Sequence, residues 1–165
     1  MESLFKPNTI FAALKRSDRR GFFHWMIYLC TGESSGYKYH ATTDGATSEW
    51  HYECAPWQAA TDSSMAVTFT KIGELPEWMD HGFLDNYLRE IPMAVPKVDY
   101  QREKAFTCRV WFRAAIRQLH DSGMFVECSD VDSLESELKN RATAAEYLGN
   151  LPHVYETTLA RAWRW

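Results

Sequence analysis

The feature that most constrains the fold is an apolar run, Phe22–Cys30, whose only polar groups are the His24 imidazole and the Tyr28 hydroxyl. A run this rich in aromatic and β-branched residues is typical of a central strand that is covered on both faces. Thr31–Gly36 has the composition of a turn, and Tyr37–Thr42 predicts a returning strand. We therefore expect an antiparallel hairpin at the centre of the fold.

This hairpin predicts that two histidines meet. His24 stands at the start of the first strand, and His40 stands near the end of the second. Because paired antiparallel strands run in opposite directions, the two imidazoles are expected at the same edge of the sheet.

A second constraint is a predicted helix that begins with a cysteine. Thr107 is a good N-cap residue, and apolar residues after Cys108 recur at helical spacing until Ser122 and Gly123 end the pattern. A free thiol with a pKa near ~8.5 is only about 3% ionised at pH 7, and a helix N-terminus lowers that pKa by less than one unit. A reactive Cys108 would therefore need a neighbouring imidazole; otherwise it is a small core residue.

The remaining elements complete a single domain over residues 1–165. We expect a lead-in at residues 1–20 with a short helix over Thr9–Lys15, a core at residues 21–128 with further strands and two helices, and C-terminal helices at residues 129–165. Asp130 or Asp132 caps the first C-terminal helix, and residues 151–165 are expected to form another. Strands followed by helices indicate an α+β fold, with an antiparallel sheet packed against helices.

Composition narrows the possible partners. The net charge is −4, which provides no basic surface for nucleic acid. The N-terminal residues lack a leader-like apolar stretch, and no segment is long enough to span a membrane. We therefore expect a cytoplasmic protein with four reduced cysteines, and the sequence leaves its oligomeric state open.

These residues suggest a cysteine-dependent site. Cys108 is the candidate nucleophile, His24 the base that takes its proton, and His40 the group that orients His24. Asp44 or Glu53 are alternatives to His40, since carboxylates often take that role.

Other side chains are candidates for contacting substrate. Trp25, Trp50 and Trp57 are either core residues or walls of a cleft, and Arg109 either lies on a helix surface or holds a substrate anion. His51 and Cys54 raise the alternative of a zinc site, but their spacing is not that of a structural zinc cluster. We expect no metal and no other cofactor.

Two motifs carry a family resemblance. The run Phe23–Leu29 followed by Tyr39–Ala41 resembles the two histidine strands of the lecithin:retinol acyltransferase-like family. The order Lys71–Glu74, Phe83–Leu88, Cys108 is similar to that of the PPPDE family of isopeptidases. Both families are circularly permuted relatives of the papain-like NlpC/P60 fold. The whole sequence is also similar to small uncharacterised proteins of filamentous fungi.

The resemblance implies a permuted papain-like hydrolase or acyl transferase that forms a thioester on Cys108. Its substrate would be a small-molecule, acyl, peptide or isopeptide compound that presents an amide, ester or thioester. Thr107 stands where those families usually carry Asn, which favours an alternative, a binding or interaction module of the same fold without activity. A biosynthetic enzyme that uses the same site for cyclisation or acyl transfer is a further alternative.

Overall fold

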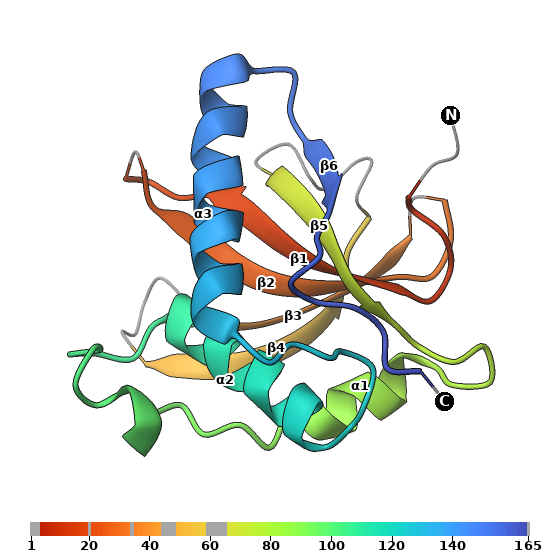
Figure 1. Cartoon of the computed structure of the whole chain (residues 1–165), viewed down its shortest axis with the longest axis horizontal. Helices are drawn as coiled ribbons and strands as arrows, with labels where there is room; N and C mark the ends of the chain where they lie inside the picture. Colours follow the sequence, from red (N-terminus) through yellow and green to blue (C-terminus); the bar gives the residue numbers. More distant parts are fainter. Residues whose placement is uncertain (1–3, 20, 34, 44–48, 59–65, 165) are drawn as a thin grey trace.

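A mixed sheet carries three α-helices on one of its faces. The computed structural model describes residues 4–19, 21–33, 35–43, 49–58 and 66–164. The strands are β1 (Thr9–Arg16), β2 (Phe23–Cys30), β3 (Gly36–Thr43), β4 (Trp50–Pro56), β5 (Ala66–Glu74) and β6 (His153–Glu156). The helices are α1 (His81–Leu88), α2 (Cys108–Asp121) and α3 (Val131–Leu148), with a 3-10 turn η1 (Lys97–Asp99). Figure 1 shows α3 in front of the sheet, with α1 and α2 at its lower end.

The strand order is β4-β3-β2-β1-β5-β6. Every neighbouring pair is antiparallel except β5 and β6, which run parallel. The α+β class and the sheet packed against helices are thus confirmed, but the purely antiparallel sheet was wrong. The connection between β5 and β6 contains all three helices, and this long crossover allows β6 to run parallel to β5.

The first strand replaces a predicted helix. Residues expected to form a short helix over Thr9–Lys15 form β1, which lies between β2 and β5. Its side chains alternate between the two faces: Ile10 and Leu14 pack under the helices, and Phe11 packs on the opposite face. A short continuous apolar run does not show whether it is a helix or a strand, and in β1 the pairing on both sides decides the outcome.

The C-terminal region differs in a similar way. Helix α3 begins after Asp130, one of the two predicted N-caps, and Gly149 is its C-cap. The helix expected within residues 151–165 is instead the short strand β6, paired with β5. Three half-buried residues and one exposed residue are too few to show a period, so the free edge of β5 determines their conformation.

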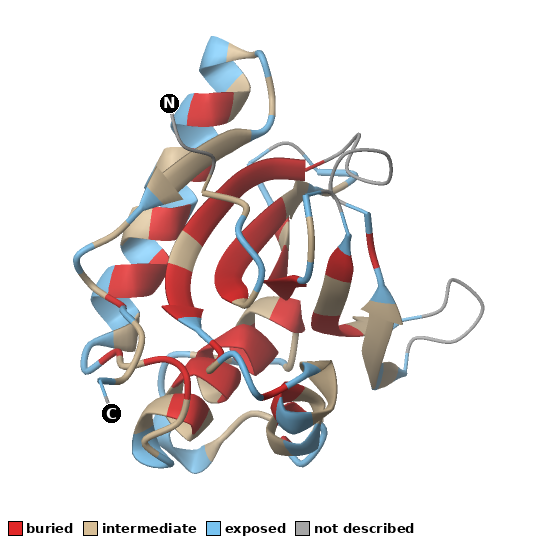
Figure 2. Cartoon of the chain, turned by 90° about the vertical axis from the view of Figure 1, so that its right-hand side faces the viewer, coloured by how far each residue is buried: buried red, intermediate tan, exposed pale blue. Residues whose placement is uncertain are grey.

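The main core lies between the sheet and the helices. It includes residues from Ile10 on β1 to Ala160 near the C-terminus, so the N-terminal strand and α3 share one core. In Figure 2 the buried residues follow the central strands and the inner sides of the helices. A smaller apolar cluster on the other face contains Phe11, Tyr28 and Trp57. None of the helices in the described ranges is both long and apolar enough to cross a membrane.

Candidate functional site

Three side chains on adjacent strands form a hydrogen-bonded relay on the face opposite the helices. His24 lies on β2, His40 on β3 and Glu53 on β4. The distance from His24 Nε2 to His40 Nδ1 is 2.6 Å, and the distance from His40 Nε2 to Glu53 Oε1 is 2.9 Å. The predicted contact between the two histidines is therefore present. Glu53 was an alternative to His40 as the group that orients His24, but in the structure it contacts His40.

The hydrogen bonds determine which nitrogen carries each proton. The carboxylate of Glu53 accepts only, so His40 Nε2 donates to it and His40 Nδ1 is left as an acceptor. His24 Nε2 must then be the donor to His40. In the neutral form this leaves a lone pair on His24 Nδ1, which has no hydrogen-bond partner among the described residues.

Strand alternation explains why the relay faces away from the helices. Phe23 and Trp25 point into the main core, so His24 between them points to the opposite face. His40 and Glu53 lie directly opposite each other in the β3–β4 register, on that same face. The β2–β3 pairing covers only Ile27–Cys30 of β2. On the N-terminal side of Ile27, the imidazoles of His24 and His40 make the contact between the two strands.

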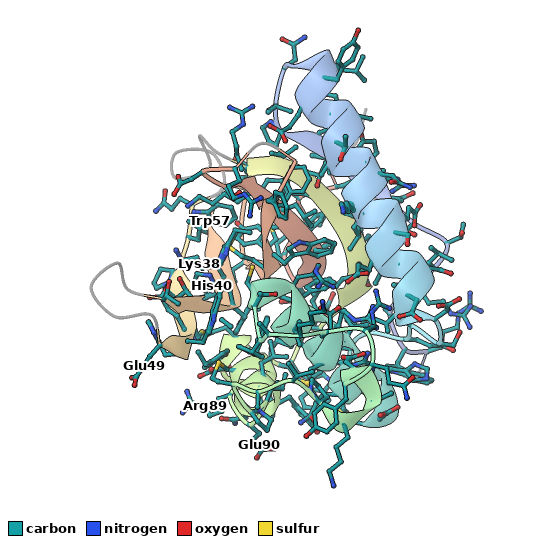
Figure 3. The ribbon with its side chains drawn as sticks, turned by 90° about the vertical axis from the view of Figure 1, so that its left-hand side faces the viewer. Lys38, His40, Glu49, Trp57, Arg89 and Glu90 are labelled. Atoms are coloured by element: carbon teal, nitrogen blue, oxygen red, sulfur yellow. The ribbon has the colours of Figure 1, made fainter. Side chains whose placement is uncertain are left out.

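The relay lines a pocket of about 420 Å³, which we call the histidine pocket. Its lining comprises Lys15, Arg16, Ser17, Asp18, His24, Met26, Lys38, His40, Thr42, Thr43, His51, Glu53 and Trp57. Figure 3 shows Lys38, His40 and Trp57 close together on this side of the sheet. Lys38 Nζ lies 3.7 Å from Glu53 Oε1, and the Arg16 guanidinium pairs with Glu146 at 3.0 Å. Within the described part of the chain, Lys15 has no ion-pair partner.

The surroundings keep both imidazoles neutral. Burial, followed by the electrostatic effects of His40, Lys15 and Lys38, lowers the pKa of His24 to about 3. Burial also lowers the pKa of His40, although its hydrogen bond to Glu53 opposes this. The same hydrogen bond lowers the pKa of Glu53. At neutral pH the relay therefore consists of a carboxylate and two uncharged imidazoles.

Cys108 does not join this relay. It opens α2 as predicted, and the Thr107 side chain accepts a hydrogen bond from the backbone N–H of Val110. Its Sγ lies 4.0 Å from the carbonyl oxygen of Phe23, on the helix-covered face, whereas His24 points to the other face. The ion pair expected between Cys108 and His24 is not formed, because the strand places the two side chains on opposite sides.

The thiol is also in the wrong state for an ion pair. Cys108 is 8% exposed, and burial raises its pKa, against smaller opposing effects of nearby backbone groups and of Arg109. No histidine lines its pocket within the described residues. Cys108 therefore rests as a neutral thiol, and its role as a nucleophile stays a prediction. All four cysteines are free.

Cys108 lines a separate pocket of about 670 Å³, which we call the thiol pocket. Its lining comprises Gly21, Phe22, Phe23, Trp25, Arg102, Glu103, Thr107, Cys108, Arg109, Glu135 and Lys139. Two of these residues were predicted to contact substrate. Trp25 is 3% exposed and packs on Phe112, and Arg109 pairs with Glu103 at 2.5 Å and with Glu135 at 2.6 Å.

The other predicted substrate contacts lie apart. Trp57 is buried, lines the histidine pocket and packs on Tyr28 and Phe69. Trp50 packs on Phe106 and borders the main core, on the other face of the sheet. The two tryptophans therefore do not form one cleft.

The zinc alternative has no support in the structure. Among the described residues, no group of three metal-ligating side chains is placed to hold an ion. Alternation along β4 separates Cys54, which borders the main core, from His51 and Glu53, which line the histidine pocket. Asp44, the other candidate for orienting a histidine, lies outside the described residues.

Lys15 and Lys38 are functional candidates that the sequence alone did not single out. Both lie on strands, at positions that share a face with the histidines. Lys38 is two residues from His40, so alternation along β3 was a usable signal. Lys15 could not be placed in this way because its strand was predicted to be a helix.

These observations describe an α+β domain with a histidine relay on the sheet face opposite the helices. The chain belongs to a family of unknown function (DUF6540), whose model matches residues 12–126. This match spans the relay and Cys108, and the family description names no activity. No curated protein and no solved structure matches the chain.

Proposed function

We propose that the chain is a binding domain for a small oxyanion that still carries a proton, such as a hydrogen phosphate or a phosphomonoester, held in the histidine pocket. One observation carries the proposal: the relay presents a neutral imidazole acceptor beside Lys15 and Lys38. The two ammonium groups attract the anion, and the lone pair of His24 Nδ1 accepts its O–H. The alternative of a binding module is thus preferred to the predicted enzyme.

The pKa values favour binding over base catalysis in this pocket. A general base works best when its pKa is close to the operating pH, and the pKa of His24 is about 3. Such an imidazole is a weak base but a good uncharged acceptor. The relay through His40 to Glu53 fixes its orientation and its tautomer, which suits recognition of a single ligand proton.

Phosphate and sulfate provide a test of this proposal. The two ions are similar in size and charge, but only phosphate carries a proton at pH 7. Titration calorimetry should show that phosphate binds and that sulfate binds at least about tenfold more weakly, the cost of leaving one hydrogen bond to an anion unmade.

Two lysine variants provide a matched pair. Lys38 pairs with Glu53 in the histidine pocket, and Lys71 pairs with Glu74 at 2.6 Å on β5, away from it. Lys38→Gln should weaken phosphate binding by about three- to tenfold, and Lys71→Gln should leave it unchanged. Equal binding of sulfate and phosphate, or equal loss in both variants, would overturn the proposal.

A cysteine-dependent hydrolase or acyl transferase of permuted papain-like architecture is the second candidate. It is favoured by the position of Cys108 at the start of a 14-residue helix, with its Sγ 4.0 Å from the carbonyl oxygen of Phe23, the residue before His24. The thiolate would attack an amide, isopeptide, ester or thioester and form an acyl-enzyme that water or an amine resolves. For this mechanism, the His24 side chain would first have to move from the face of the histidine pocket to the face of the sheet where Cys108 lies.

An ester substrate tests this candidate. If Cys108 is a nucleophile, p-nitrophenyl acetate should release a burst of nitrophenol equal to the protein concentration, and Cys108→Ser should abolish it. Release at the same rate in the wild type and in Cys108→Ser would reject the candidate.

A further inference from the structure

The thiol pocket has one aromatic wall and one charged wall, and we propose that it binds an aromatic carboxylate. This site is distinct from the histidine pocket, lies on the other face of the sheet and does not require Cys108 to react. Its volume of about 670 Å³ is within the range of small-molecule sites in proteins.

The aromatic wall consists of Phe22, Phe23 and Trp25. Phe23 and Trp25 are almost fully buried, whereas Phe22 is 54% exposed at the mouth of the pocket. The Arg19 guanidinium lies over the Phe22 ring at 4.3 Å from its centroid. The part of the ring that remains exposed offers an aromatic contact to a flat ligand. Aromatic rings gain more from such neighbours than aliphatic chains of equal area do, which selects a ring over a chain.

The charged wall leaves one cation for the ligand. Arg109 is bound by Glu103 and Glu135, and Arg102 is bound by Glu135 at 3.0 Å and by Asp132 at 2.7 Å. Arg113 and Arg117 extend this network to Asp132 and Asp99. Four guanidinium groups then face four carboxylates, and their charges cancel. Lys139, on α3, also lines the pocket and has no ion-pair partner among the described residues.

The net charge of the thiol pocket predicts the sign of the ligand's charge. Because the ion-pair network is neutral as a whole, Lys139 leaves the pocket with a formal charge of +1. A ligand carboxylate at Lys139 cancels this charge, whereas an ammonium group would add to it. An aromatic body against Phe22 with a carboxylate at Lys139 therefore matches both walls.

Binding of four probes, measured by titration calorimetry, tests the proposal. Naphthalene-2-carboxylate is the expected ligand. Naphthalene-2-carboxamide has the same shape without the charge, 2-naphthylmethylammonium reverses the charge, and octanoate keeps the carboxylate without the ring. We expect the naphthoate to bind about fivefold more tightly than the carboxamide, the upper range for an exposed ion pair, and the other two more weakly than the naphthoate.

Single variants test how each wall of the thiol pocket contributes to ligand binding. Lys139→Gln should remove the preference for naphthoate over the carboxamide, and Lys97→Gln, a lysine outside the pocket, should keep it. Phe22→Ser should weaken the binding of both the naphthoate and the carboxamide. Since Lys139 and Phe22 are both exposed, these variants are expected to fold.

The outcomes separate this inference from the proposed function. Tight binding of the ammonium probe, equal binding of octanoate and naphthoate, no effect of Lys139→Gln or no binding at all would each overturn it. Lys38→Gln, in the histidine pocket, should leave naphthoate binding unchanged. If Lys38→Gln abolished it, the ligand would occupy the histidine pocket, and the inference would be wrong for the thiol pocket.

Discussion

At the scale of single residues, His24 is the most unusual group in the molecule. Its imidazole is half-buried on the sheet face opposite the helices, hydrogen-bonded to His40 at 2.6 Å and beside two lysines, and its pKa falls to about 3. A folded protein that keeps a histidine neutral loses stability when the unfolded chain can take up the proton. The free-energy cost of keeping His24 neutral should therefore appear as a pH dependence of the free energy of unfolding.

Between pH 6.5 and pH 5 the unfolded chain protonates His24, whereas the folded chain does not until about pH 3. The free energy of unfolding should therefore fall as the pH falls, by up to about 1.4 kcal/mol per pH unit from this residue. His24→Gln, whose amide can still donate to His40, should flatten that slope in urea denaturation measured at several pH values. His51→Gln, at an exposed position, is the control. An unchanged slope in His24→Gln would show that His24 is not held neutral.

Cys108 provides a second prediction at this scale. Because burial raises the pKa of its thiol, iodoacetamide should alkylate Cys108 more slowly than a free thiol such as glutathione at pH 7. The rate should not change in His24→Ala, since the two side chains lie on opposite faces of the sheet. Mass spectrometry assigns the rate to each cysteine. If Cys108 reacts faster than Cys30, Cys54 and Cys128, and His24→Ala slows it, the cysteine enzyme becomes the first candidate.

At the scale of elements, an ion-pair network joins η1, α2 and α3. Arg113 on α2 is 1% exposed and bonds Asp99 at 3.2 Å and Asp132 at 2.6 Å, and Arg117 shares Asp99 at 2.6 Å. Asp99 is equally buried. Removing one member of a buried ion pair leaves an uncompensated charge, which costs far more than the loss of an exposed pair.

Asp99→Ala should therefore lower the free energy of unfolding by about 3 kcal/mol, because it leaves two guanidinium groups without this carboxylate. Arg89→Ala, which breaks an exposed pair with Asp85, should cost less than about 1 kcal/mol. Urea denaturation measures both. Equal costs in the two variants would show that the network around Asp99 contributes little to stability.

Some elements follow from the sequence and others do not. The hairpin, the bounds of α2 and the start of α3 followed from turn composition and from the caps Thr107 and Asp130. The face of the sheet that His24 occupies did not follow. Its strand is apolar on both faces, so no alternation indicates which side each residue takes, and a shift of one residue moves His24 from one pocket to the other. Two histidines were correctly brought together, and the cysteine was placed on the wrong side of them.

At the scale of the whole molecule, the C-terminal segment is part of the core although the family match ends at residue 126. Leu134 and Leu138 on α3 are fully buried, and Ala142 and Ala145 continue the same stripe. Each buried leucine contributes roughly 2 kcal/mol, and a typical domain has a total stability of only about 5–15 kcal/mol. The sheet and α1 and α2 should therefore not be stable without α3.

A fragment of residues 1–128 should consequently lack a cooperative thermal transition, because it exposes the apolar surface that α3 covers. A fragment that ends at Arg161 keeps α3 and β6 and should melt close to the full chain. Near-ultraviolet circular dichroism follows both, since the tryptophans report on packing. Cooperative melting of the 1–128 fragment near the temperature of the full chain would show that the core closes without α3.

The central claim is that the neutral relay of Glu53, His40 and His24 receives a protonated oxyanion, and nitrogen NMR of the histidine rings tests it most directly. With ¹⁵N-labelled histidine, His24 should show a protonated Nε2 and a bare Nδ1 down to pH 5. Phosphate should shift the His24 Nδ1 resonance as a hydrogen bond forms, and sulfate should leave it unchanged. If His24 instead titrates near its ordinary pKa of 6.5, or if phosphate and sulfate act alike, the account of this site is wrong.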